Sequence, residues 1–136
     1  MKYFALCMLL AVGVYACDKV DDLPFYPNGT APVLSSSVTE IAPTPADSMN
    51  VVVTFSWTNP HYATDSNNVK YILQIDSAGR NFSKAVNKEI MGSLQTSFTA
   101  KEFNDILLSF GFAFGVSYNI EVRLLSSYAN NNEQYA

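Results

Sequence analysis

A cysteine that stands directly behind a short apolar segment is the residue of this chain best placed for covalent chemistry. Met1 and Lys2 give a positive start, residues 3–14 carry no charge, and the small Ala16 precedes Cys17. The apolar run is shorter than the roughly 20 residues that cross a bilayer, and it has the form of a secretory signal peptide. A small residue and then cysteine after such a segment is the arrangement in which a diacylglycerol alkylates the thiol before the chain is cut.

We therefore predict that residues 1–16 are a signal peptide and that Cys17 attaches the mature chain to a membrane through lipid. Tyr15 departs from the commonest form of this arrangement, in which its position is small. The alternative is an ordinary cleaved signal peptide that leaves Cys17 as a free thiol.

The remaining sequence offers few residues that could bind a metal ion. Cys7 leaves with the signal peptide, so the mature chain has one cysteine, which allows no internal disulfide and no thiolate cluster. His61 is the only histidine, and it lies in a polar loop beside Tyr62 and Asp65. Because a metal site needs several converging ligands, we interpret His61 as a solvated loop residue and predict no metal and no cofactor.

Catalytic groups are equally sparse. Glu102, Asp105 and Glu121 are scattered over outward faces, and no pair of carboxylates is placed for acid–base work. The chain has neither a glycine-rich phosphate loop nor a nucleophile elbow. We predict that the protein is not an enzyme.

Two short segments resemble a modification motif. Asp76-Ser77-Ala78 and Asp47-Ser48-Met49 are similar to the Asp-Ser/Thr-aliphatic sequence that Bacteroidetes glycosylate on exported proteins. A three-residue pattern carries little information, and ordinary turn residues are the simpler interpretation.

Composition narrows the class of protein. The 136 residues include 8 Lys and Arg against 12 Asp and Glu, with a pI near 4.7, and no basic run occurs. This balance argues against nucleic acid as a partner, because such binding neutralises phosphates. Aromatic residues make up 13% of the chain and charged residues 15%, so the mature part is expected to be one folded domain.

The segment behind Cys17 has the composition of a linker. Pro24, Pro27 and Pro32 together with Gly29 rule out a helix there and favour an extended tether. We predict a lipid-anchored linker over residues 17–31 and a domain over residues 32–136.

Most of that domain alternates with the period of a strand. In residues 51–58, Val51, Val53, Phe55 and Trp57 share one face, and in the strand around Tyr71 the inward residues are Tyr71, Leu73 and Ile75, with Lys70, Gln74 and Asp76 outward. Residues 33–41 and 84–91 read as weaker strands, and 118–127 as the last one, with Tyr118, Ile120, Val122 and Leu124 inward.

One helix interrupts the strands. Thr99 and Glu102 form a capping box, and Phe98 and Phe103 are spaced for a hydrophobic staple. Gly111 supplies a stop, so we predict a helix over residues 100–110.

Short strands with one short helix predict an all-β, immunoglobulin- or fibronectin III-like β-sandwich. Trp57 would be the core tryptophan, and Tyr118 would start a strand as a tyrosine corner, with its hydroxyl bonded back to the backbone. Since the large aromatics fall on inward faces, we expect no exposed aromatic platform for a sugar.

The sandwich is expected to lack its last strand. After residues 118–127 the chain offers the turn-forming Asn130-Asn131-Asn132 and then only residues 133–136. Four residues are fewer than the usual five or six of a strand. We therefore predict a C-terminally truncated domain whose strand 118–127 presents an unpaired edge, which recruits other strands.

Segments spread over the chain together resemble the N-terminal region of SusE-type lipoproteins. They are CDKVDD at 17–22, TAP at 30–32, VTFSW at 53–57, YILQIDSAG at 71–79 and YNIEVR at 118–123. That family comprises outer-membrane starch-binding lipoproteins of Bacteroidetes starch-utilisation systems.

The resemblance implies a surface-anchored outer-membrane protein with no enzymatic role, which works beside a TonB-dependent porin. Asp18, Lys19, Asp21 and Asp22 are similar to the signal that sends such lipoproteins to the cell surface. The resemblance also implies that this domain is a spacer and that starch or a related glycan binds to modules that follow it. No carbohydrate-binding residue carries over to a position here. The alternative is a free-standing immunoglobulin-like adhesin or assembly subunit.

Overall fold

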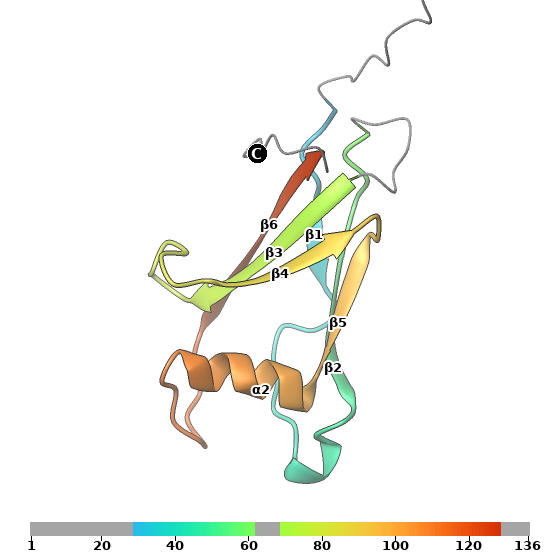
Figure 1. The fold of residues 1–136 in the computed structure, drawn as a ribbon. Coiled ribbons are helices and arrows are strands. Elements are labelled where there is room, and N and C mark those ends of the chain that lie inside the picture. The colour runs from blue at the N-terminus through green and yellow to red at the C-terminus, as the bar shows by residue number, and fades with distance from the viewer. Residues whose placement is uncertain (1–28, 62–68, 129–136) are drawn as a thin grey trace, which may run out of the picture.

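The computed structural model describes residues 29–61 and 69–128, which form two antiparallel sheets and one α-helix (Figure 1). The elements in chain order are β1 (Leu34–Ser36), the 3-10 turn η2 (Pro45–Asp47), β2 (Val51–Trp57), β3 (Val69–Ser77), β4 (Val86–Met91), β5 (Gln95–Thr99), α2 (Ala100–Ser109) and β6 (Ile120–Tyr128). The predicted all-β sandwich with one short helix is confirmed. The predicted stub at residues 129–136 lies outside the described residues, so the missing last strand stays a prediction.

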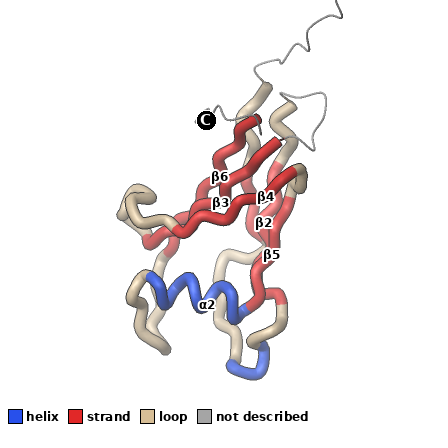
Figure 2. The backbone as a smooth tube through the Cα atoms, viewed as in Figure 1, coloured by secondary structure: helices blue, strands red, loops and turns tan. Residues whose placement is uncertain are grey.

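The chain crosses repeatedly between the two sheets. One sheet has the order β1-β2-β5 and the other β4-β3-β6, so β2 to β3, β4 to β5, and β5 to β6 all change sheet. Such crossings place the inward faces of the two sheets against each other, as in immunoglobulin-like sandwiches. Figure 2 shows the strands as two layers with α2 across one end.

The core forms where the alternating faces of β2 and β3 meet. Tyr71 and Leu73 of β3 are 0% exposed, and Val53 of β2 is 1% exposed. The rings of Trp57 and Tyr71 lie 5.2 Å apart, which confirms Trp57 as the core tryptophan. Each such side chain contributes about 1.5–3 kcal/mol through burial, so these two strands supply most of the hydrophobic stabilisation.

Helix α2 begins as its sequence predicts. Thr99 accepts a hydrogen bond from the Glu102 N–H, and the Glu102 carboxylate accepts from the Thr99 N–H at 2.8 Å. The rings of Phe98 and Phe103 lie 6.0 Å apart, so the predicted staple is present. Phe103 is buried against the core, which holds α2 over the end of the sandwich. Gly111, with φ of 82°, follows the helix in the left-handed conformation that favours glycine.

Two strand predictions need correction. The strand predicted over 33–41 is only Leu34–Ser36, because Ser37 uses its side-chain oxygen to accept the Thr54 N–H at 2.9 Å and the chain then leaves the sheet. Strand β5 was not predicted at all. Its residues Gln95, Thr96 and Ser97 are polar, and Phe98 is the one buried large apolar residue it contributes, so no apolar alternation marks it.

Two side chains predicted from alternation lie elsewhere. Asp76, predicted to point outward, is 0% exposed and accepts hydrogen bonds from the backbone N–H groups of Ser77 at 2.7 Å and Lys84 at 3.1 Å. Tyr118, predicted as an inward strand residue, precedes β6 and is 42% exposed. Its hydroxyl does bond back to the backbone, since it accepts the Ala113 N–H at 3.2 Å.

The described segment begins and ends at one end of the sandwich, and α2 lies at the other (Figure 1). At the first end, the Thr30 N–H donates to the Pro60 carbonyl at 2.8 Å, which ties the incoming chain to the end of β2. Among the described residues no helix is long and apolar enough to span a membrane.

Candidate functional site

The residues predicted to carry the anchor and the export signal are Cys17, Asp18, Lys19, Asp21 and Asp22, and all five lie outside the described residues. The structure does define where that segment joins the domain. Besides the bond from Thr30, the Val33 N–H donates to the Thr58 hydroxyl at 2.9 Å. The domain therefore receives its N-terminal segment at the end remote from α2.

His61 is exposed and occupies the left-handed region with φ of 56°. Its N–H donates to the Asn59 side-chain oxygen at 2.9 Å, so the residue serves a tight turn after β2. Its sequence neighbours Tyr62 and Asp65 lie outside the described residues. In residues 29–61 and 69–128, no three His, Cys, Asp or Glu side chains come together as metal ligands.

The three carboxylates named in the sequence analysis each form a separate structural contact. Glu102 caps α2, and its bonds from the Thr99 backbone and side chain hold the pKa of its carboxyl below the ordinary value. Asp105 pairs with Lys101 at 2.7 Å, which raises the pKa of Lys101. Glu121 accepts the Gly79 N–H at 3.2 Å. These carboxylates do not form an acid–base pair.

The two possible glycosylation motifs differ in access. Ser48 is exposed in the turn behind η2, next to Met49, which is 74% exposed. The carboxylate of Asp47 bonds to Thr44, which lowers the pKa of Asp47. Ser77 is half-buried beside the fully buried Asp76. Of the two motifs, only the one at Ser48 presents its hydroxyl-bearing residue on the surface.

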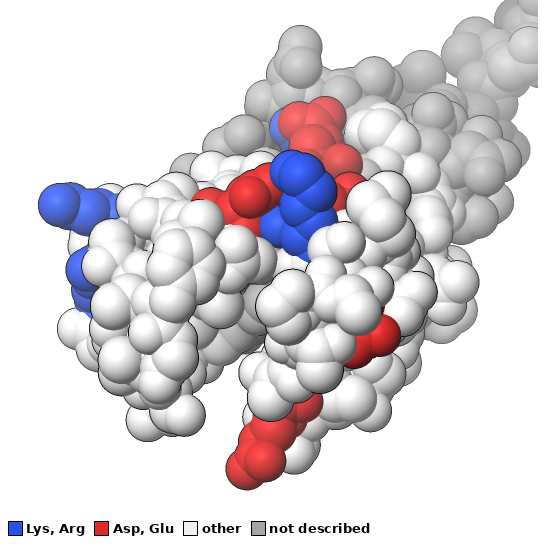
Figure 3. Space-filling view, turned by 90° about the horizontal axis from the view of Figure 1, so that it is seen from below, with Lys and Arg blue, Asp and Glu red and all other residues white. Residues whose placement is uncertain are grey.

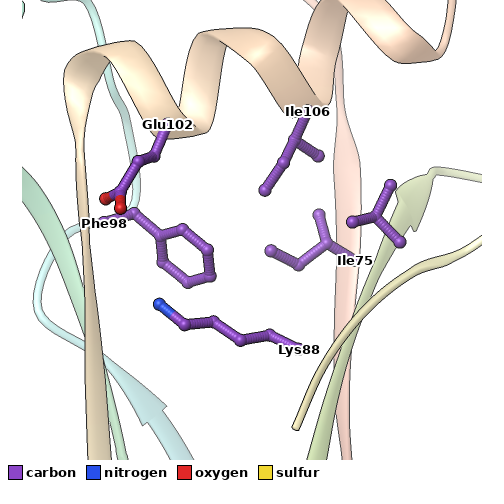
Figure 4. A pocket seen from close by; sticks show the side chains of 6 residues that line it. Ile75, Lys88, Phe98, Glu102 and Ile106 are labelled. Carbon is purple, nitrogen blue, oxygen red and sulfur yellow. The ribbon is translucent and has the colours of Figure 1, made fainter.

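A cavity of about 260 Å³ lies beneath α2, between β3, β4 and β5. It is lined by Ile75, Val86, Lys88, Phe98, Glu102 and Ile106. Figure 4 shows Ile75 and Ile106 pointing into it and the Lys88 side chain passing the Phe98 ring. The volume is below the roughly 300–1,000 Å³ of ordinary small-molecule sites, so the cavity accommodates at most a small apolar group.

Both charged groups of this cavity are already engaged by the fold. The Lys88 ammonium lies 4.1 Å from the centre of the Phe98 ring and donates to the Ser97 carbonyl at 3.2 Å. The Glu102 carboxylate is bonded to Thr99. The cavity is therefore a gap between the two sheets that the Lys88 side chain bridges, and both of its charged groups already have partners within the domain.

An exposed apolar surface at the α2 end is the feature that sequence reasoning missed. We use the name end surface for the individually exposed apolar residues of α2 and the loop that follows it, which are Leu108, Phe114, Val116 and Tyr118, with Phe114 78% exposed. Tyr118 stacks on Phe112 with ring centroids 3.8 Å apart and planes 6° apart. Most of the molecule seen from this end is uncharged (Figure 3). The signal that could have revealed it is the run of apolar residues 112–118, interrupted by a glycine.

Comparison with protein families gives one match. The family model described as SusE outer membrane protein matches residues 19–125, which covers the segment behind Cys17 and nearly all of the sandwich. No curated protein and no solved structure matches the chain. The match extends over more than half of the 136 residues, and the chain belongs to the SusE outer membrane protein family.

Proposed function

We propose that this outer-membrane protein of a Sus system is a non-catalytic lipoprotein anchored at the cell surface, and that its sandwich is a spacer. The observation that carries the proposal is the extent of the family match, which begins at Lys19, two residues behind the predicted anchor, and continues into β6 as far as residue 125. The family match thus joins the segment from Lys19 onward to the sandwich, and the predicted anchor Cys17 lies two residues before it. The sandwich would hold following glycan-binding modules at a distance from the membrane and beside a TonB-dependent porin.

The anchor is tested by changing Cys17→Ala in the complete precursor. The variant should lose incorporation of labelled fatty acid and leave the membrane fraction. Cys7→Ala is the matched control, because Cys7 departs with the predicted signal peptide and its loss should change neither result. Full labelling of the Cys17→Ala protein would refute lipid attachment at this residue.

Surface display is tested separately by changing Asp21 and Asp22 to Ala. The variant should stay lipidated but resist protease added to intact cells, because the export signal is gone while the anchor remains. Replacing Asp105, which is exposed on α2, is the matched control for lost negative charge. If protease still removes the Asp21/Asp22 variant, the export-signal assignment is wrong.

The spacer role predicts that the sandwich itself binds no starch. Calorimetric titration of residues 29–136 with maltooligosaccharides should give no measurable heat of binding. A dissociation constant in the millimolar range or tighter would contradict the spacer role, and Phe114→Ala would then show whether the end surface is responsible.

A second function, an adhesin or assembly subunit, is favoured by one observation. The end surface exposes Phe114 and Val116, at 78% and 56%, on the side of the domain remote from its N-terminal segment. Exposed apolar patches of this kind mark protein contacts. Loss of partner capture in a Phe114→Ser variant, with starch binding of the complete protein unchanged, would favour this function.

A further inference from the structure

The loop between β3 and β4, residues 78–85, holds two adjacent side chains in a costly backbone conformation. Asn81 has φ of 51° and Phe82 has φ of 56°, so both lie in the left-handed region. A bulky residue such as phenylalanine rarely adopts this conformation, and it persists only where the surrounding structure enforces it. Strain of this kind is concentrated at sites that bind a partner or a ligand, which makes the loop a candidate for such a site.

Carboxylates from β3 and β6 hold the backbone of this loop. Asp76 accepts the N–H of Ser77 at 2.7 Å and that of Lys84 at 3.1 Å, so one buried side chain joins the two ends of the loop. Glu121 of β6 accepts the Gly79 N–H at 3.2 Å. Both carboxylates are thus engaged by backbone groups of the loop, which is fixed in one conformation.

The Phe82 ring is held by a cation of the neighbouring strand. The guanidinium of Arg123 in β6 lies 4.1 Å from the centre of this ring, and its Nε donates to the Gln74 side-chain oxygen at 2.6 Å. One face of the ring is therefore covered, and Phe82 as a whole is half-buried. Phe82 contributes to the rigidity of the loop and is not an open platform on which a sugar ring could stack.

Two further cations of the loop remain available. Arg80 and Lys84 flank the strained pair, and in the described part of the chain neither side chain has a carboxylate within ion-pair distance. Figure 3 shows Lys and Arg side chains without an Asp or Glu beside them on the side of the molecule where the loop projects in Figure 1. Since the whole chain has a net charge of −4, this loop departs from its overall acidic character.

We propose that the loop between β3 and β4 docks an acidic segment of a partner protein, whose carboxylates pair with Arg80 and Lys84. Arginine offers a planar fork that matches a carboxylate, and lysine adds a point charge. Because the backbone between the two side chains is fixed before binding, less conformational entropy is lost on docking. This contact goes beyond the spacer role and does not depend on the lipid anchor.

Two features favour a protein over other anionic partners. The loop follows the end of β3 nearer to α2, away from the end of the sandwich at which the N-terminal segment enters, so it lies away from lipid headgroups next to the predicted anchor (Figure 1). The covered ring of Phe82 disfavours an acidic glycan, because sugars are bound largely by stacking on an open aromatic face.

The contact is tested by NMR titration of residues 18–136 with a glutamate-rich peptide whose termini are blocked, at low ionic strength. The amide signals of residues 78–84 should shift and saturate. Arg80→Gln and Lys84→Gln should each weaken binding about threefold, as expected for an exposed ion pair. Lys101→Gln is the matched control and should bind as the unmodified protein does, because Lys101 is already paired with Asp105.

A further variant separates the fixed loop from its charge alone. Phe82→Gly keeps both cations but removes the contact with Arg123 and frees the backbone, so it should also weaken binding. A galacturonate oligomer at equal carboxylate concentration should bind less tightly than the peptide. The proposal is overturned by an absence of saturable shifts, by equal losses in Lys101→Gln, by undiminished binding of Phe82→Gly, or by tighter binding of the galacturonate oligomer.

Discussion

The two long sides of the sandwich are closed in different ways. On one side, β4 and β5 are joined by the short turn 92–94, and Lys88 of β4 reaches across to the Phe98 ring and the Ser97 carbonyl of β5. On the other side, the three-residue β1 lies at the border of its sheet and the nine-residue β6 at the border of the facing one, and the core side chains of β6 stay half-buried.

The difference follows from connectivity. The β4–β5 side is closed by residues close in sequence, and α2 follows β5 directly and covers the adjoining end. The β1–β6 side joins segments about ninety positions apart, with no short turn to fix them. Among the described residues no strand pairs with the outer side of β6, so this is the side at which a further strand would add to the sheet.

The largest expected loss of unfolding free energy is at the centre of the core, and it is compared with the loss on the β6 side. Leu73→Ala should lower the free energy of unfolding by about 3 kcal/mol, because Leu73 is 0% exposed and its removal leaves a cavity. Leu124→Ala makes the same chemical change in a half-buried side chain of β6 and should cost about 1 kcal/mol. Urea titrations of both variants measure the two values, and equal losses would mean that the β6 side is packed as tightly as the centre.

The helical end of the sandwich can be weakened through its cap. Thr99→Ala removes the acceptor for the Glu102 N–H and should cost about 1 kcal/mol of unfolding free energy. Thr44→Ala, in the 3-10 turn η2, is a matched control, because that turn contributes no buried residue. Thermal denaturation of both should show a clear loss for Thr99→Ala and a smaller one for Thr44→Ala.

Removing the contacts of Lys88 that link β4 to β5 should have a smaller effect on the free energy of unfolding. Lys88→Met keeps the aliphatic stem but removes the ammonium from the Phe98 ring and from the Ser97 carbonyl, at an expected cost of about 0.5–1 kcal/mol. Lys84→Met removes a charge from an exposed side chain and serves as the control. A loss no greater than that of the control would mean that the turn and the core close this side without help from Lys88.

The smallest effect is the pH dependence of the helix cap. The bonds from Thr99 lower the pKa of Glu102 below its ordinary 4.5, so the ionised carboxylate stabilises the folded state above that pH. The contribution should be lost as the pH falls from about 4.5 through the lower folded-state pKa. The stability difference between the unmodified protein and Glu102→Gln should therefore shrink on acidification. In a Thr99→Val background the pH dependence should be reduced but not abolished, because valine lacks the hydroxyl and keeps the backbone N–H that donates to Glu102. An unchanged pH dependence there would assign the effect to the backbone N–H alone.

Much of the fold could be predicted from local patterns. The alternation in β2 and the cap formed by Thr99 and Glu102 are local, and both are present as predicted, except that Val51 at the start of β2 is 61% exposed. Strand β5 was not predicted because its polar residues show no apolar alternation, so only pairing with β2 identifies it as a strand. Asp76 was misplaced because alternation ignores a carboxylate that is buried to organise the loop after β3.

The candidate functional residues were predicted less well from the sequence than the strands and the helix. Tyr118 fits the inward alternation of the last strand, yet β6 begins two residues later and leaves the ring stacked on Phe112 at the surface. The start of a strand depends on the partner that ends opposite it, and here β3 ends at Ser77, opposite Ile120. The end surface is thus a tertiary feature, whereas the anchor at Cys17 remains a prediction from local sequence.

The contrast between a sealed and an open side is tested most directly by residue-resolved amide hydrogen exchange along β6 in residues 18–136. In dilute, monomeric protein, the amides of Ile120, Val122 and Leu124 should exchange rapidly, and those of Glu121, Arg123 and Leu125 should be protected by β3. Uniform protection of β6 in the monomer would contradict the account, because its outer edge would then already be covered.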